Sequence, residues 1–202
     1  KATERGFPID RITIIPPAFL PSNETYHEPS LDNTLYVVSA SRLVWTKGYS
    51  YAIRAFARMI ERLPEGTKCK YIILGDGPES ELMASEITRL RMEQHVTLLG
   101  WVDQVTVNQW LGKASIYLLL SIEEGFNNSV LQAQAFGLPC IVSDAGGLPE
   151  NVLHDETGYV APRYDVETTA EYLYRLAVDA NLRIKMCNKS KSRVLREFEL
   201  SK

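Results

Sequence analysis

Two cationic side chains follow the first strongly apolar segment of the chain. Arg42 and Lys47 lie in the segment 41–48, which comes directly after the β-rich run 35–40 and ends in a glycine. Arginine offers a planar fork of N–H donors and lysine a point charge, and both bind phosphate oxygens. The segment could hold a phosphate or diphosphate, or it could be a solvated loop with two ordinary surface charges.

A second candidate site lies in the segment 121–139, where a polar loop separates an apolar strand from a helix. Free N–H groups and the positive end of a helix dipole make such a junction an anion site. Glu124 stands in the loop, where an ionised carboxylate can accept hydrogen bonds from sugar hydroxyls, and Gln132 lies about two turns further on. Taken alone, Glu124 could instead cap the helix, and Gln132 could be a neutral surface residue.

Glycine-containing turns follow two further strands. Gly75 and Gly77 lie in one of them, and the segment 143–150 carries the pair Gly146 and Gly147. Glycine lets a ligand or another chain segment approach the backbone closely. The same dipeptides also form simple tight turns, so the local sequence leaves both interpretations open.

Alternating strands and helices must position these motifs. We expect strands over 35–40, 70–74, 95–99, 115–120, 140–143 and 158–160, and helices over 49–62, 79–91, 105–111, 129–136, 149–153, 166–179 and 181–198. Short apolar strands that alternate with amphipathic helices predict an α/β fold, a Rossmann-like parallel sheet with helices on both faces. Ligands of such sheets bind beyond the C-terminal ends of the strands, and each motif above follows a strand.

Composition narrows the classes of function. The 45% hydrophobic content is enough for a core, and the net charge of −3 argues against a nucleic-acid partner bound through overall positive charge. Three widely spaced cysteines and three histidines without ligand spacing predict neither disulfides nor a metal site, and they favour a reducing compartment. No apolar run reaches the ~20 residues that a membrane-spanning helix needs.

The four motifs, in this order, resemble those of family-4 glycosyltransferases, whose GT-B fold has two facing Rossmann-like domains. The resemblance runs from about residue 6 to residue 198 and covers only the C-terminal, donor-binding half of such an enzyme. Arg42 and Lys47 match the element that holds the donor diphosphate, with Ser41 where glycine is usual. Gly75 and Gly77 match the Gly-x-Gly-Pro turn of the family.

The remaining motifs match the donor site of the family. Leu99 lies at the strand end whose backbone meets the nucleotide base, and Glu124 matches the first acid of the Glu-x7-Glu signature. The loop and helix start whose amides meet the sugar and phosphates correspond to Gly125, Phe126, Asn127, Asn128 and Ser129. Gln132 stands where the second acid, which accepts hydrogen bonds from the ribose, is usual. Because glutamine lacks the charge, we expect weaker or altered ribose binding.

The resemblance implies a retaining transferase that uses a nucleotide-diphospho-sugar and needs no cofactor or metal. Arg42 and Lys47 would offset the charge on the departing diphosphate, and Glu124 would hold sugar hydroxyls. Residues 1–34 would be the inter-domain crossing and a remnant of an N-terminal domain, and residues 35–198 the nucleotide-sugar-binding domain. The acceptor site would lie in the missing N-terminal domain, so this segment alone should bind nucleotide without transferring sugar. The family suggests a cytoplasmic role in cell-envelope polysaccharide synthesis, with the full-length enzyme often at the inner membrane surface.

Three other classes share part of the pattern. A dinucleotide-dependent oxidoreductase would need Gly-x-Gly-x-x-Gly after the first strand, which is missing. A nucleotide-sugar epimerase has a related two-domain fold, but the loop at Glu124 favours transfer. A non-catalytic nucleotide- or sugar-binding module remains a third option because of Gln132.

Overall fold

The structure, a computed structural model, describes residues 33–198. Nearly all of the predicted inter-domain segment, residues 1–34, therefore lies outside the described residues. Within them, six strands form one parallel sheet in the order β3-β2-β1-β4-β5-β6. The strands are β1 (Leu35–Ala40), β2 (Cys69–Leu74), β3 (Val96–Gly100), β4 (Ile116–Leu119), β5 (Cys140–Ser143) and β6 (Gly158–Ala161).

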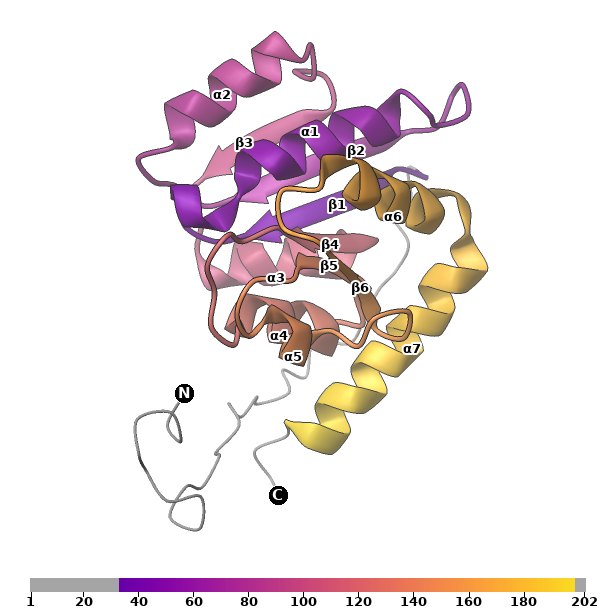
Figure 1. The fold of residues 1–202 in the computed structure, drawn as a ribbon. Coiled ribbons are helices and arrows are strands. Elements are labelled where there is room, and N and C mark those ends of the chain that lie inside the picture. Colours follow the sequence, from indigo (N-terminus) through magenta and orange to yellow (C-terminus); the bar gives the residue numbers. More distant parts are fainter. Residues whose placement is uncertain (1–32, 199–202) are drawn as a thin grey trace.

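Helices cover both faces of the sheet (Figure 1). They are α1 (Tyr49–Ile60), α2 (Ser80–Arg89), α3 (Gln104–Lys113), α4 (Asn128–Ala135), α5 (Leu148–Asn151), α6 (Val166–Val178) and α7 (Ala180–Glu197). The predicted Rossmann-like α/β fold is confirmed, and the predicted element ends agree to within two residues. The sequence pattern did not predict the short 3-10 helix η3 (Trp45–Lys47).

The sheet separates two apolar layers. In β1, the fully buried Val37 joins the cluster that α1, α2 and α6 cover, whereas its neighbour Val38 joins the cluster under α3, α4 and α5. Successive side chains of a strand point to opposite faces, so a strand buried on both faces is apolar without alternation. This explains why the central strands appear in the sequence as continuous apolar runs.

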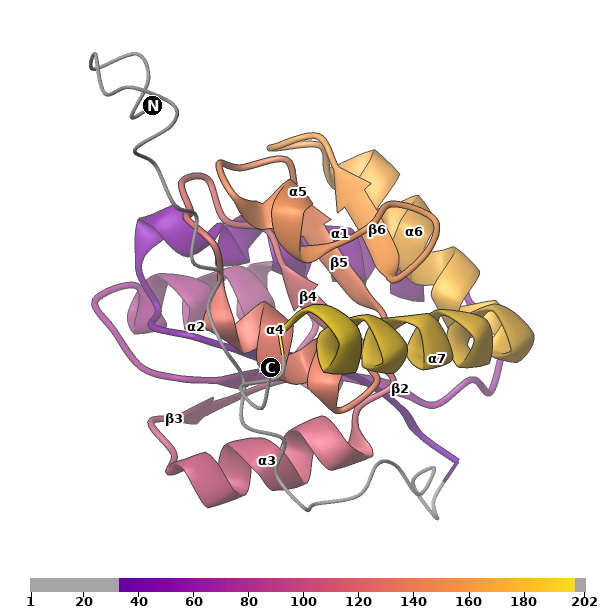
Figure 2. The ribbon, with the colours of Figure 1, turned by 90° about the horizontal axis from the view of Figure 1, so that it is seen from below.

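The last helix connects the two faces. α7 begins beside α6 and ends against α4, where Val194 and Phe198 pack on Leu131 (Figure 2). Among residues 33–198, no helix combines the length and apolar character that crossing a bilayer requires.

The strand order places a topological switch point between β1 and β4. From β1 the chain moves to β2 on one side, and from β4 it moves to β5 on the other. The loops that leave β1 and β4 therefore begin side by side at the carboxyl edge of the sheet, which is where ligands of such folds bind. These two loops carry the two strongest sequence motifs.

Candidate functional site

Lys47 and Glu124 meet at the switch point. Lys47 ends η3 after β1, Glu124 lies in the loop after β4, and the Lys47 Nζ atom donates a hydrogen bond to Glu124 Oε2. The side chains are 18% and 14% exposed, so the ion pair is mostly shielded but still reachable from solvent. Glu124 Oε2 also accepts a hydrogen bond from Ser121 Oγ at 3.1 Å. The structure thus brings together residues of two motifs that are far apart in the sequence.

The two loops approach so closely that only glycine fits between them. Gly48 has a φ of +65°, and a Cβ atom there would lie 1.9 Å from the carbonyl oxygen of Leu120. The Ile122 N–H donates to the Thr46 carbonyl at 2.7 Å, which ties the loops together one step further out. The glycine that ends the basic motif is therefore needed for the contact between the loops as well as for the turn.

Arg42 extends from the same loop into solvent. Its side chain is exposed, and no acidic partner pairs with it among the residues that the structure describes. The backbone around it is fixed, because the Leu43 N–H donates to the Asp76 carbonyl at 3.0 Å. Beside it, Ser41 Oγ lies 2.7 Å from the hydroxyl of Tyr49, whose pKa is raised by burial. An exposed arginine whose backbone is fixed in this way can bind an anion.

The glycine turns pack closely against the backbone of the two loops. A Cβ atom at Gly75 would lie 2.0 Å from the Ser41 carbonyl oxygen, and one at Gly77 would lie 2.3 Å from that of Leu43. A Cβ atom at Gly146 would lie 1.8 Å from the carbonyl oxygen of Glu124. These glycines therefore allow close approach of another chain segment, which is one of the two options that the sequence left open. A direct role of Gly75 and Gly77 in donor binding stays a prediction.

Asn127 caps the helix that starts at the second motif. Its Oδ1 accepts hydrogen bonds from the Val130 N–H at 3.0 Å and from Ser129 Oγ at 2.7 Å. Its backbone N–H donates to Asn151 Oδ1 at 2.9 Å, so this amide is already engaged. The N–H groups of Asn128 and Ser129 lie in the first turn of α4, where no helical carbonyl can accept them. They are the better candidates for an anion.

The other residues of this loop differ in their surroundings. Gly125 and Asn128 are exposed, whereas the ring of Phe126 packs against that of Phe198 with centroids 5.5 Å apart. The hydroxyl of Tyr117, a buried side chain of β4, donates to Ser129 Oγ at 2.8 Å, and burial raises its pKa. Tyr117 therefore stays a neutral donor. This contact was not predicted, because a tyrosine within an apolar strand gives no signal of its partner.

The side chain of Gln132, a residue of α4, is hydrogen-bonded to α3. Its Nε2 atom donates to Asn108 Oδ1 of α3 at 2.8 Å, and Asn108 also accepts from Gln104 at 3.0 Å. The carboxamide oxygen of Gln132 remains as an acceptor. Leu99, which was predicted to lie near the base, is 38% exposed at the end of β3, and Trp101, two residues further along the chain, is 78% exposed.

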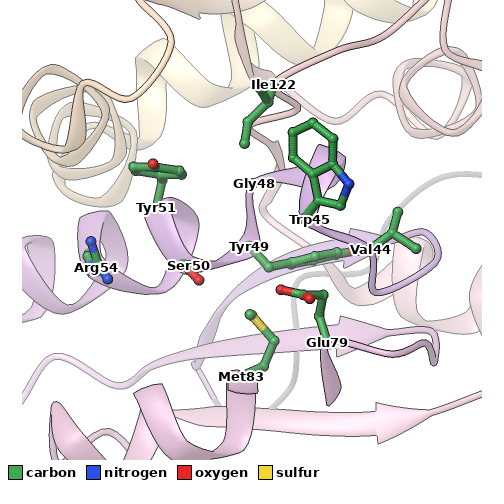
Figure 3. A pocket seen from close by; sticks show the side chains of 10 residues that line it. All are labelled: Val44, Trp45, Gly48, Tyr49, Ser50, Tyr51, Arg54, Glu79, Met83 and Ile122. Carbon is green, nitrogen blue, oxygen red and sulfur yellow. The ribbon is translucent and has the colours of Figure 1, made fainter. Parts of the chain in front are cut away.

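A pocket of about 250 Å³ lies beside these loops (Figure 3). It is bounded by the turn before α1 and the starts of α1 and α2, and its lining includes Trp45, Tyr51, Glu79 and Ile122. None of Arg42, Lys47 and Glu124 lines it. Ligand pockets usually measure about 300–1,000 Å³, so this one is small for a nucleotide-sugar. No three His, Cys, Asp or Glu side chains within residues 33–198 gather into a possible metal site.

The family model described as "Glycosyl transferases group 1" matches residues 23–193. N-acetyl-alpha-D-glucosaminyl L-malate synthase of Bacillus anthracis is 31% identical over 150 residues, which cover 74% of this chain and 38% of that protein. Amylovoran biosynthesis glycosyltransferase AmsK of Erwinia amylovora is 31% identical over 176 residues, covering 84% and 41%. The chain thus spans about two fifths of the length of these relatives.

Solved structures share the fold at lower sequence identity. A mutant of S. aureus TarM, in complex with Fondaparinux, alpha-GlcNAc-glycerol and UDP, superposes with a TM-score of 0.85 at 19% identity, covering 98% of this chain and 39% of that chain. Anabaena Alr3699/HepE in complex with UDP and glucose superposes with a TM-score of 0.75 at 23% sequence identity, covering 84% of this chain and 46% of that chain. The C-terminal domain of the glycosyl transferase group 1 family protein LpcC from Francisella tularensis superposes with a TM-score of 0.77 at 20% sequence identity, covering 91% of this chain and 97% of that chain.

Proposed function

Because the chain belongs to the group 1 glycosyl transferases, we propose that its described part is the domain that binds a nucleotide-diphospho-sugar in a retaining enzyme. The observation that carries the proposal is the meeting of Lys47 and Glu124 at the switch point, with the exposed Arg42 on the same loop as Lys47. This arrangement offers positive charge for a diphosphate and a carboxylate for sugar hydroxyls at the same edge of the sheet.

The ion pair explains how the charges of Lys47 and Glu124 are stabilised at the switch point when no ligand is bound. An unpaired charge in a shielded site would be costly, and pairing offsets part of that cost. Lys47 has three N–H donors, so it can keep Glu124 on one and offer the others to phosphate oxygens. Glu124 likewise has acceptor positions left for a sugar hydroxyl. Donor binding therefore requires the pair to share its partners and does not require it to separate.

In the proposed reaction, the bond between the sugar and the diphosphate breaks while negative charge grows on the leaving diphosphate. Arg42, Lys47 and the first-turn N–H groups of α4 stabilise that charge, because fixed donors that face a developing charge lower the barrier. Glu124 orients the sugar. The acceptor hydroxyl would then attack the anomeric carbon on the face from which the diphosphate departs and give its proton to the departing diphosphate, which retains the anomeric configuration. Acceptor groups would come from the part of the longer protein that this chain does not cover.

We further propose a role in the synthesis of a cell-envelope polysaccharide, supported by the name of the Erwinia amylovora relative. The cysteines at 69, 140 and 187 are buried and form no disulfide. Such cysteines fit a cytoplasmic location.

A calorimetric titration of this chain with UDP, GDP and ADP tests the proposal. We expect one diphosphate to bind, and Arg42→Ala to weaken it about tenfold to a hundredfold, because a charge-assisted hydrogen bond contributes about 1.5–3 kcal/mol. Arg58→Ala is the matched control, since Arg58 is an exposed arginine in the last turn of α1. Binding of no diphosphate, or equal affinity of Arg42→Ala and the unaltered chain, would refute the proposed function.

A nucleotide-binding module without transferase activity is a second candidate. Gln132 favours it, because the position that would accept hydrogen bonds from the ribose is neutral and its amide is tied to Asn108. Kinetics on the longer natural protein separate the two candidates. Sugar transfer that is lost in Lys47→Ala supports the enzyme, whereas nucleotide binding without turnover supports the module.

A further inference from the structure

The carboxamide of Asn151 holds the backbone of the loop 124–127, called here the donor loop. Asn151 is the last residue of α5 and is 1% exposed. Its Oδ1 accepts the Asn127 N–H at 2.9 Å, and its Nδ2 donates to the Asn127 carbonyl at 3.1 Å. A carboxamide is both donor and acceptor, so a single side chain pairs with both backbone polar groups of one residue. This fixes the donor loop immediately before α4.

Two other helices hold Asn151 itself in place. Its backbone carbonyl accepts a hydrogen bond from Gln134 Nε2 of α4 at 2.9 Å and another from Arg193 Nη1 of α7. Arg193, whose side chain is 9% exposed, also donates to the Glu150 carbonyl at 2.7 Å. Both carbonyls lie at the C-terminal end of α5, where backbone acceptors lack helical partners. The C-terminal helix thereby supports the donor loop through Asn151.

α7 also contacts the donor loop directly. The ring of Phe198, at the end of α7, packs against Phe126, and the guanidinium of Arg193 lies 5.4 Å from the centroid of the Phe198 ring. The loop is thus held at two neighbouring residues, Phe126 by packing and Asn127 by hydrogen bonds. Between them and Glu124 lies only Gly125, which is exposed.

We propose that Asn151 is a positioning residue for donor binding, an inference that rests on the proposed function. Asn151 touches no donor atom in this scheme, because it is buried behind Asn127. It fixes the backbone from which Asn128 and Ser129 continue, so their first-turn N–H groups are already placed when a diphosphate arrives. Hydrogen-bonding N–H groups that are fixed in advance bind an anion more tightly, since less conformational freedom is lost on binding.

Hydrogen exchange of backbone amides tests whether Asn151 holds the loop. Asn151→Leu keeps most of the side-chain volume but removes both hydrogen bonds, and Asn151→Ser serves if the leucine variant does not fold. Ser190→Ala is the matched control, because Ser190 is a fully buried residue of α7 whose hydroxyl donates to the Thr157 carbonyl at 3.1 Å. We expect the Asn127 amide to lose protection in the Asn151 variants only. Unchanged protection would overturn the inference.

Titration with the diphosphate that the unaltered chain binds, and with the corresponding nucleoside, tests the consequence for binding. We expect Asn151→Leu to weaken the diphosphate about tenfold and to leave nucleoside affinity unchanged, which a merely structural role would not do. Ser190→Ala should lower the melting temperature and change neither affinity. Equal weakening of both ligands, or none, would overturn the positioning role while leaving the proposed function intact. A failure of the unaltered chain to bind any diphosphate would refute the proposed function, and the exchange experiment would still decide whether Asn151 holds the loop.

Discussion

Replacing Gly146 by alanine should damage the site through the backbone of Glu124. The added Cβ atom would lie 1.8 Å from the Glu124 carbonyl oxygen, whereas such contacts are essentially never shorter than 3.0 Å. The carbonyl must therefore move by more than an ångström. That same carbonyl accepts the Gly147 N–H at 3.1 Å, so the movement also strains or breaks a hydrogen bond.

Replacing a second glycine by alanine measures the cost of a positive φ without the collision. Gly66, in the loop between α1 and β2, has a φ of +83°, close in kind to the +51° of Gly146, but its Cβ atom would meet nothing within 4 Å. A positive φ costs an alanine about 1–2 kcal/mol, partly offset by about 0.4–1 kcal/mol from the stiffer unfolded chain. We expect Gly66→Ala to lower the free energy of unfolding by about 1 kcal/mol.

Gly146→Ala carries two further costs in the free energy of unfolding. Overpacking typically costs about 1–3 kcal/mol, and a lost hydrogen bond about 1 kcal/mol. The variant should therefore be about 2–4 kcal/mol less stable than Gly66→Ala. With a urea dependence of about 1–3 kcal/mol per molar, its urea midpoint should fall about 1 M or more below that of Gly66→Ala.

Urea unfolding followed by circular dichroism, with both variants beside the unaltered chain, measures the difference. Diphosphate affinity under native conditions is the second readout, and it should fall only in Gly146→Ala because only that change moves the peptide of Glu124. Equal midpoints for the two variants would refute the reasoning, since the collision with the Glu124 carbonyl would then cost nothing.

Three further changes have expected outcomes. Gln132→Glu should raise nucleotide affinity about threefold to tenfold in calorimetry, because a charged acceptor strengthens a hydrogen bond to ribose and Asn108 can turn its amide toward the carboxylate; equal or weaker binding would contradict this. The pKa of Glu86 is lowered to about 2, chiefly by hydrogen bonds from Arg89. A lowered carboxyl pKa adds stability above its ordinary value of 4.5 that is lost as the pH falls toward 2, so Glu86→Gln should cost about 1 kcal/mol at pH 7 and progressively less in urea titrations across that range. Arg193→Met should cost about 2–4 kcal/mol in thermal unfolding, because the two hydrogen bonds that the Arg193 guanidinium donates to the Glu150 and Asn151 carbonyls are lost and the Asn151 carbonyl keeps only Gln134 Nε2; a loss below 1 kcal/mol would show that α7 is held by apolar packing.

The sequence by itself determined the elements and their class. Apolar runs such as 35–40 and 140–143 predict buried strands because burial on both faces removes alternation, and this signal is local. The motifs at Arg42 and Glu124 could be placed after strands for the same reason. Lys47 and Glu124 could also be recognised as candidate site residues, and the family resemblance assigned both to one donor site.

Contacts between distant loops could not be predicted in this way. Lys47 and Glu124 are 77 positions apart, and Asn127 and Asn151 are 24 apart. Whether such pairs meet depends on which strands are neighbours, and strand order is not written in the periodicity of any one segment. Asn151, Tyr117 and Asn108 were therefore missed, because a lone polar residue gives no sign of its partner.

The glycines illustrate the same division. Their positions after strands were visible in the sequence, but whether they admit a ligand or another chain segment was not. The answer depends on the order β3-β2-β1-β4-β5-β6, which places Gly75 against Ser41 and Gly146 against Glu124. Local chemistry therefore determined which groups are available, and the packing of the whole sheet decided which of them meet.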